Sequence, residues 1–482
     1  MNIKQLKPTL VWKYFYEICQ IPHVTYNEKG ITDYITQILK KAGLKPQVDA
    51  TNNIFVTKGA KKGLEKLPTV LLQAHTDMVG AKADNSLHNF DTDPIKTIIQ
   101  DGWVYADHTT LGADDGIGVA CILAALTDPS IQHGNIEALF TTQEETGMGG
   151  IKSFDIKRIK SKYLINLDGE EDLHVDIGCP GSIDVHSTIP FKRENKNKPN
   201  TTALNITIKS LLGGHSGQMI DQKRVNAIKE IFDILMLINL KYEIRIINIE
   251  RSGVAKNVIP FACSVDISIN TEDLIAIQEI VATEKSNLQL EYWEETNIEL
   301  VTKKISTKTL PMTIEDTKRI IGIYNSVFNG LYTRNQKFNV PETSSSLGLI
   351  ETTGNTVKSV FMVRSPYDNA QRKLANRIVQ TFLIAGAKAQ ADNFTPGWLP
   401  LQDDILTKIY CDTCKRLFKK DPVIGICSGG VEPSFILPNV KGMSGISVGP
   451  SMENVHSKDE RLNVESVNRF YKTLGALLKN IH

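Results

Sequence analysis

The order of apolar and amphipathic segments constrains the fold of the first 185 residues most strongly. Short apolar runs alternate there with segments whose apolar residues recur at helical spacing. Strands that alternate with helices predict an α/β sheet with helices on both of its faces. The apolar runs expected to form strands are NIFVTKG, TVLLQAH, NIEALFTT and YLINLD.

The pattern changes after a lysine-rich stretch at residues 191–202. The segments that follow alternate apolar and polar residues, as strands with one solvent-facing side do. Two successive segments of the order β-α-β-β-α are expected, at about 203–290 and 296–390, and they predict an inserted domain made of two similar halves. The predicted domains are a discontinuous domain of residues 1–188 and 393–482 and an inserted α/β lid domain of residues 189–392.

Histidine and acidic residues stand at or just beyond the carboxyl ends of predicted strands, or open a predicted helix. They are His75, Asp77, Asp114, Asp115, Glu144, Glu145, Asp168 and His456. In open α/β sheets, ligands bind at the carboxyl edge of the strands. Each residue alone has an ordinary explanation, because an Asp before a helix is commonly a cap and a Glu pair after a strand commonly faces solvent. Together, so many carboxylates would repel one another without a cation, and they predict a metal site.

These residues lie in five motifs, in the order LQAHTDMV, LGADDGIG, TTQEETGMGG, LINLDGEE and SVGPSMENVHSKDERL. The motifs resemble the metal-site motifs of the di-zinc exopeptidases related to aminoacylase and bacterial carboxypeptidase G. Further segments resemble more narrowly the aminoacyl-histidine dipeptidase branch, among them DIGCPGS, LLGGHSGQMI, AKNVIP and MVRSP. The resemblance covers essentially the whole chain. It implies a zinc-peptidase-like mixed sheet sandwiched by helices, with the lid domain inserted in it.

The resemblance also implies a role for each residue of the predicted metal site. His75 and Asp168 would bind one metal ion. Glu145 and His456 would bind the other, and Asp114 would bridge the two ions. Imidazole and carboxylate are zinc ligands, and two metal ions about 3.5–4 Å apart need a shared oxygen donor. The expected cofactor is therefore a pair of divalent ions, in the first place Zn²⁺, although carboxylate-rich sites also accept Mn²⁺ or Co²⁺.

Two further acidic residues would complete the chemistry. Asp77 is expected to accept the second ring N–H of His75 and so to fix its tautomer. Glu144 would be the general base, which takes a proton from the attacking water and returns it to the leaving amine. In this family the peptide bond after the bridging Asp is cis, so the resemblance predicts a cis bond between Asp114 and Asp115.

The lid domain would contribute the substrate contacts. His215 resembles the family histidine that polarises the scissile carbonyl. Asn257 and Arg364 resemble the residues that hold the substrate backbone and its free carboxylate, which a planar guanidinium can pair with through two hydrogen bonds. Each of the three also has an ordinary structural explanation, as a turn histidine, a loop asparagine and a strand-end arginine. Ser428 departs from the dipeptidase pattern, which has histidine there, and this leaves the preference for histidine-containing substrates open.

The balance of charge excludes some classes of partner. The 482 residues include 55 Lys and Arg against 54 Asp and Glu, for a net charge of +1, whereas nucleic-acid binding requires a concentrated basic surface. No apolar run reaches the roughly 18 residues of a membrane span, and the polar start lacks the pattern of a secretory signal. We therefore expect a cytoplasmic protein without nucleic-acid or membrane partners, which acts on a small peptide as a monomer or a homodimer.

The predicted function is metal-dependent hydrolysis of dipeptides, of the Xaa-His type or broader. Two alternatives within the same family are an N-acyl amino acid deacylase, whose substrate has a blocked amino group, and a tripeptide aminopeptidase. An alternative from another class is a catalytically silent metal- or peptide-binding protein. The presence of all five expected ligands, together with Asp77 and Glu144, argues against that last reading.

Overall fold

The computed structural model describes residues 3–401 and 403–481, and the chain divides into two compact units. The terminal unit comprises Met1–Cys179, Trp398–Cys427 and Val431–His482, and the inserted unit comprises Pro180–Gly397 and Ser428–Gly430. The domain boundaries expected after residues 188 and 392 fall inside strands β9 (Gly181–Pro190) and β19 (Lys388–Thr395). The chain passes between the units just before β9 and just after β19, where no change of composition marks the sequence.

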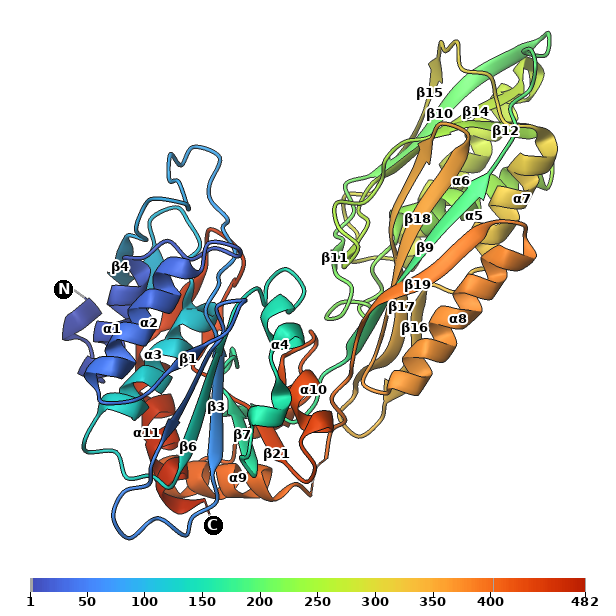
Figure 1. The fold of residues 1–482 in the computed structure, drawn as a ribbon. Coiled ribbons are helices and arrows are strands. Elements are labelled where there is room, and N and C mark those ends of the chain that lie inside the picture. Colours follow the sequence, from blue (N-terminus) through green and yellow to red (C-terminus); the bar gives the residue numbers. More distant parts are fainter. Residues whose placement is uncertain (1–2, 402, 482) are drawn as a thin grey trace. The chain divides into compact units, whose positions relative to one another are not determined.

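The terminal unit is built on an eight-stranded mixed sheet, which confirms the predicted fold class (Figure 1). In spatial order its strands are β1 (Gln47–Val48), β2 (Ile54–Lys58), β6 (Ile136–Thr141), β3 (Val70–His75), β7 (Tyr163–Asn166), β21 (Ser444–Ser447), β8 (His174–Asp176) and β20 (Val423–Gly425). The central strands β6, β3, β7 and β21 run parallel to one another. All of their residues are buried, which explains why β3, β6 and β7 are mostly apolar in the sequence, whereas β21 consists of small residues around Ile446.

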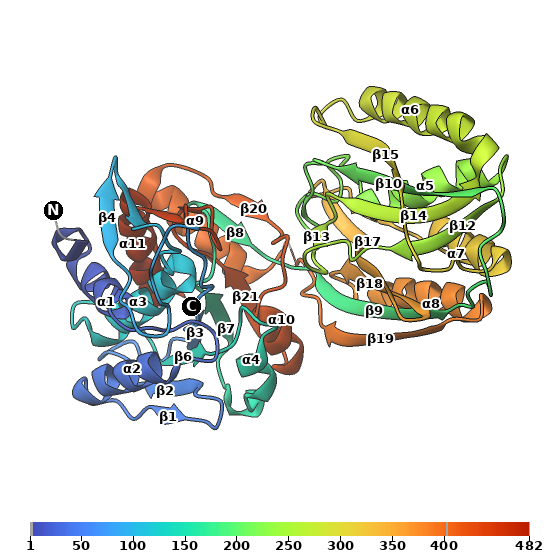
Figure 2. The same ribbon diagram turned by 90° about the horizontal axis from the view of Figure 1, so that it is seen from above.

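Helices cover both faces of this sheet. On one face α3 packs against β3, with α1 beside it; on the other, α4 and α10 contribute Ile151 and Ile436 to an apolar cluster with Leu71 and Leu139 of the sheet. Figure 2 shows α4 and α10 on the side opposite α1, α3 and α11. The helices are α1 (Thr9–Cys19), α2 (Lys29–Lys41), α3 (Ala113–Thr127), α4 (Gly149–Ser153), α9 (Ile405–Phe418), α10 (Pro433–Ile436) and α11 (Val464–Asn480).

A smaller four-stranded antiparallel sheet completes the terminal unit. Its order is β22 (Met452–Glu453), β23 (Arg461–Asn463), β5 (Trp103–Ala106) and β4 (Thr97–Gln100). The sheet joins the segment before α3 to the segment before α11. Asn463 caps α11, and its side chain accepts the backbone N–H of Ser466.

The inserted unit contains two larger antiparallel sheets, one of four strands and one of five. The four-stranded sheet has the order β12 (Ile244–Ile249), β14 (Cys263–Asn270), β10 (Thr201–Lys209) and β15 (Glu299–Ile305). The five-stranded sheet has the order β16 (Gly330–Asn335), β17 (Val340–Thr353), β18 (Thr356–Ser365), β9 and β19. The short strands β11 (Gly214–His215) and β13 (Val258–Ile259) form a separate pair.

The helices of the inserted unit join these two sheets into one apolar core. They are α5 (Ala227–Asn239), α6 (Leu274–Glu291), α7 (Ile314–Ser326) and α8 (Asp368–Ile384). The order of elements repeats as the sequence predicts, but the sheets do not follow the two predicted halves. Strand β15, from the second segment, pairs with β10 of the first, and the five-stranded sheet is completed by β9, which precedes both segments, and by β19, which extends beyond the second.

Candidate metal centre

The parallel topology brings the predicted site residues to one edge of the large sheet. His75 is the last residue of β3, and Glu144 and Glu145 follow the end of β6. Asp168 follows β7, and His456 comes after β21 and the short strand β22. Because these four strands are adjacent and parallel, their carboxyl ends lie together, and so do the side chains that follow them.

Asp114, near the start of α3, lies at the centre of this cluster. Its Oδ1 lies 3.0 Å from Nε2 of His75, and its Oδ2 lies 3.1 Å from Nε2 of His456. His75 Nε2 also lies 3.4 Å from Oδ1 of Asp168, and His456 Nε2 lies 3.0 Å from Oε2 of Glu145. The two oxygens of Asp114 therefore face two separate histidine–carboxylate pairs.

The spacing of these donor atoms fits metal ions. Two ligand atoms bound at 2.0–2.1 Å to a tetrahedral Zn²⁺ lie about 3.3 Å apart, and the histidine–carboxylate distances of 3.0–3.4 Å bracket that value. Donor atoms of His75, Asp114 and Glu145 all lie within 4.8 Å of one another, and so do those of His75, Asp115 and Asp168. The three carboxylates carry three negative charges and neutral histidines carry none, so two divalent ions bound here would leave a net charge of one positive unit.

Asp115 is close to the centre, but backbone N–H groups bind its carboxylate. Its Oδ2 accepts the N–H of His75 at 3.2 Å, and its Oδ1 accepts the N–H of Gly118 at 3.1 Å. The Asp114–Asp115 peptide bond is cis, as predicted. Through these two hydrogen bonds, the carboxylate of Asp115 links the end of β3 to the first turn of α3, next to Asp114.

The charges of the cluster shift the pKa values of its members in opposite directions. Burial alone would raise the pKa of Asp114, but hydrogen bonds with His456 and His75 outweigh burial and lower it. Burial alone would lower the pKa of His456, but hydrogen bonds with Asp114 and Glu145 raise it to about 11. The carboxylates thus stabilise positive charge among them, as a cation-binding site must.

Glu144 differs from the carboxylates that contact the histidines. Burial raises its pKa well above the usual range, and the negative charges of Asp168 and Glu145 add to this while His75 opposes it. A carboxyl group whose pKa is raised holds a proton more tightly and can pass it to a reacting group. Its backbone N–H donates to Oδ1 of Asp77 at 3.0 Å, which fixes the turn that carries it.

The contacts of Asp77 differ from the expected ones. Nδ1 of His75 lies 3.0 Å from the backbone carbonyl oxygen of Asp77 and 3.7 Å from its carboxylate. The carboxylate instead accepts the backbone N–H groups of Glu144 and Glu145 and the hydroxyl of Thr25. The main-chain carbonyl is therefore the hydrogen-bond partner of the His75 ring, and the carboxylate holds the turn after β6.

The three residues expected to contact the substrate lie together in the inserted unit. Nη2 of Arg364, on β18, lies 3.3 Å from Nε2 of His215. The carbonyl of Asn257 accepts the backbone N–H of Ser216, next to His215, at 2.8 Å. The carbonyl of Ser428 approaches Gly217 so closely that a Cβ there would lie only 2.5 Å from it, so the GGHSG turn requires glycine at that position.

Comparison with known proteins identifies the family. Residues 71–480 match the model of peptidase family M20/M25/M40. The chain belongs to this family. The sequence-based prediction of a metal-dependent peptidase is thereby confirmed, and all residues of the candidate metal centre of this M20 metallopeptidase lie within the matched range.

Two relatives match this M20 metallopeptidase over its whole length. It is 33% identical to the cytosol non-specific dipeptidase of Escherichia coli K12, over 100% of this chain and 99% of that protein. It is 32% identical to the crystal structure of aminoacylhistidine dipeptidase from Vibrio alginolyticus, with a TM-score of 0.88 over 100% of this chain and 98% of that one. The aminopeptidase PepT of Bacillus cereus, 17% identical with a TM-score of 0.57 over 99% of each chain, shares the fold. No helix within residues 3–401 and 403–481 has both the length and the apolar character that crossing a bilayer requires.

One carboxylate that sequence analysis missed supports the metal centre of the M20 metallopeptidase directly. Glu460 is 2% exposed. Its Oε2 accepts the N–H groups of Leu111 and Gly112 at 2.7 and 3.1 Å, and its Oε1 accepts those of Ala113 and Asp114 at 2.8 and 3.4 Å. Glu460 therefore fixes the backbone that leads into Asp114. It lies four residues after His456 in the same motif, which is the signal that would have found it.

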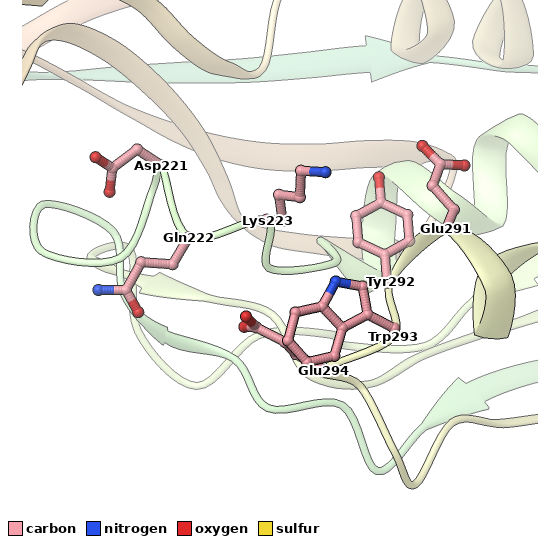
Figure 3. Close-up of a pocket in the computed structure, with 7 residues that line it drawn as sticks. All are labelled: Asp221, Gln222, Lys223, Glu291, Tyr292, Trp293 and Glu294. Carbon is pink, nitrogen blue, oxygen red and sulfur yellow. The ribbon is translucent and has the colours of Figure 1, made fainter.

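A second buried carboxylate plays the same part in the inserted unit. Glu295 is 3% exposed and accepts the N–H of Leu212 at 2.7 Å and that of Val225 at 3.3 Å. These two residues bound the loop that carries His215. A pocket of about 400 Å³ lies between residues 221–223 of this loop and residues 291–294, at and just after the end of α6 (Figure 3). The rings of Tyr292 and Trp293 line it. None of the predicted substrate residues lines this pocket.

Proposed function

We propose that this M20 metallopeptidase hydrolyses dipeptides with a pair of divalent metal ions, in the first place Zn²⁺. The observation that carries the proposal is the bridging position of Asp114, whose two oxygens face His75 and His456 at 3.0 and 3.1 Å. The full-length similarity to two proteins named as dipeptidases supports the choice of substrate.

The ligands of each ion follow from the donor pairs. His75 and Asp168 would hold one ion, Glu145 and His456 the other, and Asp114 both. Two ions held in this way would polarise the substrate carbonyl and make water a nucleophile near neutral pH. Mn²⁺ or Co²⁺ could replace Zn²⁺, because carboxylates supply most of the donors.

Glu144 would act as the general base. Its carboxylate takes a proton from the attacking water and returns it to the nitrogen of the leaving amino acid. The carboxylate of Asp77 accepts the backbone N–H groups of Glu144 and Glu145. These two hydrogen bonds would fix the turn so that Glu144 faces the water and Glu145 the metal ion. Burial keeps the pKa of Glu144 raised, so that it can both accept and release a proton.

Residues of the inserted unit would bind the substrate. The guanidinium of Arg364 suits the free carboxylate of a dipeptide, His215 would donate a hydrogen bond to the scissile carbonyl oxygen, and Asn257 would hold the substrate backbone. Ser428 replaces the histidine of the dipeptidase pattern, so we propose hydrolysis of a broader range of dipeptides than Xaa-His alone.

We further propose that the protein acts in the cytoplasm, as a monomer or a homodimer. The name of the Escherichia coli relative, a cytosol dipeptidase, supports the location. Sedimentation of the purified protein with and without a dipeptide would distinguish the two assembly states.

The first experiment measures release of free histidine from a Xaa-His dipeptide by zinc-loaded protein, beside the same dipeptide with an acetylated amino group. Hydrolysis of the free dipeptide alone is expected. Hydrolysis of the acetylated form alone would show a deacylase and contradict the proposal. If neither is cleaved, a panel of dipeptides with other carboxyl-terminal residues and a tripeptide follow, and inactivity on all dipeptides with two metal ions bound would overturn it.

A further inference from the structure

A second cluster of metal-ligating side chains lies on the five-stranded sheet of the inserted unit. Asp184 and His186 are two residues apart on β9, so their side chains leave the same face of the sheet. Asp392, on the neighbouring edge strand β19, pairs in register with Asp184. One donor atom of each of the three residues lies within 4.8 Å of the other two. The alternate residues Ile183 and Val185 belong to the apolar core, so the cluster occupies the opposite face.

The hydrogen bonds of the two aspartates leave one oxygen of each for another ligand. Oδ2 of Asp184 accepts the ammonium of Lys256 and, at 2.9 Å, the side-chain N–H of Asn393. Oδ2 of Asp392 accepts the amide of Gln390 at 3.2 Å. Among residues 3–401 and 403–481, Oδ1 of Asp184 has no hydrogen-bond partner although the residue is 1% exposed, and Oδ1 of Asp392 lies 3.2 Å from Nε2 of His186.

This arrangement is unfavourable without a cation. Like charges directly opposite each other on neighbouring strands repel, and a buried carboxylate oxygen without a partner loses its hydration. Lys256 neutralises one of the two negative charges and contacts only Oδ2 of Asp184. Two carboxylate oxygens and one imidazole nitrogen are the donor set that first-row divalent metal ions bind, with water at the remaining positions. The side chain of His186 is 42% exposed, which leaves room for that water.

We propose that Asp184, His186 and Asp392 form a binding site for a further divalent transition-metal ion, separate from the metal centre of the terminal unit. The site joins β9, by which the chain enters the inserted unit, to β19, by which it leaves. Strand β19 is an edge strand whose register shifts between Asp392 and Thr395. An ion bound there stabilises the pairing of these two strands, which is a structural role and not a catalytic one.

The test counts metal ions in the full-length protein. The protein is stripped with a chelator and equilibrated with buffered micromolar Zn²⁺, and the bound zinc per chain is measured by mass spectrometry. We expect His186→Ala and Asp392→Asn each to lose one ion per chain relative to the native protein, with the dipeptidase metal pair retained. The control is His108→Ala, because His108 also lies beside an aspartate, Asp107 at 3.8 Å, but is exposed. Equal zinc content in the native protein and His186→Ala, or equal loss in His108→Ala, would overturn the proposal.

Amide hydrogen exchange of β19 supplies a second readout that the metal centre does not affect directly. Zn²⁺ is expected to slow exchange in residues 388–395 of the native protein at least several-fold and to leave it unchanged in His186→Ala. Unchanged exchange in the native protein would contradict the proposed role even if a third ion is bound. Asp184 is not substituted, because its loss would also break the ion pair with Lys256.

Discussion

The candidate metal centre and the proposed substrate-binding cluster are assembled in different ways. Four of the five residues of the candidate metal centre lie at or beyond the ends of β3, β6, β7 and β21, which the parallel topology of the sheet brings together, and the fifth, Asp114, lies near the start of α3. His215 ends the two-residue strand β11, and Asn257 directly precedes its antiparallel partner β13, so a short strand pair outside the two larger sheets places them. Their place depends on side chains such as Glu295, which hold loop ends. Substitutions in the first region should therefore change metal binding or chemistry, and those in the second should change substrate binding.

The largest effect is expected for Glu144→Ala, which removes the proposed base from the metal centre. The value of kcat should fall by about 10²–10⁴-fold, the usual contribution of a positioned acid–base group, while both metal ions stay bound. Steady-state kinetics beside metal analysis measure this, with Thr146→Ala, an exposed neighbour on the same turn, as the control. Near-normal kcat in Glu144→Ala would show that another group is the base.

Glu460→Gln tests whether the metal centre depends on its supporting carboxylate. Each oxygen of Glu460 accepts two backbone N–H groups. The glutamine side chain would replace one of these oxygens with an NH2 group, which is a donor and cannot accept the two N–H groups that face it. Metal affinity should fall by about 10–100-fold, as for other residues that orient metal ligands, and excess metal should restore part of the activity. Asp459→Asn, exposed beside it, should match the native protein. Unchanged metal affinity in Glu460→Gln would show that residues 111–114 keep their backbone conformation without the hydrogen bonds to Glu460.

Glu295→Gln makes the corresponding change in the inserted unit. One of the two loop ends, at Leu212 or Val225, would lose its acceptor, and the loop that carries His215 would become less ordered. We expect KM to rise or kcat to fall by about 3–10-fold, a loss of roughly 1 kcal/mol for one hydrogen bond, with metal content unchanged. Glu294→Gln, which is exposed, is the control. A loss of metal in Glu295→Gln would contradict the division between the two regions.

The sequence predicts the candidate metal centre in more detail than the residues that support the two regions, and one physical reason explains the difference. Strand periodicity and the residues after each strand suffice to predict the sheet and the acidic edge, because topology follows from the pattern of elements. Glu295 accepts backbone N–H groups 83 and 70 residues away in the sequence, which no local pattern records, and Glu460 is marked only by its place in the motif of His456. The pairing of β15 with β10 was missed for a related reason, because an alternating strand does not specify which sheet it joins.

The smallest effect concerns the stability of the inserted unit, where acidic residues of α5 and α6 face one another. Burial, together with Asp233, Glu284 and Glu291, raises the pKa of Glu230 to about 7 from its ordinary value of 4.5. The folded protein therefore binds this proton more tightly than the unfolded chain, and the contribution to stability is lost as the pH rises through 7.

Glu230→Gln removes that titration. At pH 8 the variant should be more stable than the native protein by about 1 kcal/mol, after allowance for partial solvent screening, which corresponds to a rise in Tm of about 2–4 °C. At pH 5 the native side chain is already neutral in the folded state, so the two proteins should unfold at similar temperatures. Thermal unfolding at both pH values measures the difference, with the exposed α6 residue Glu279→Gln as the control. A gain that is equal at pH 5 and pH 8 would trace to packing of the amide, and not to removal of the Glu230 charge.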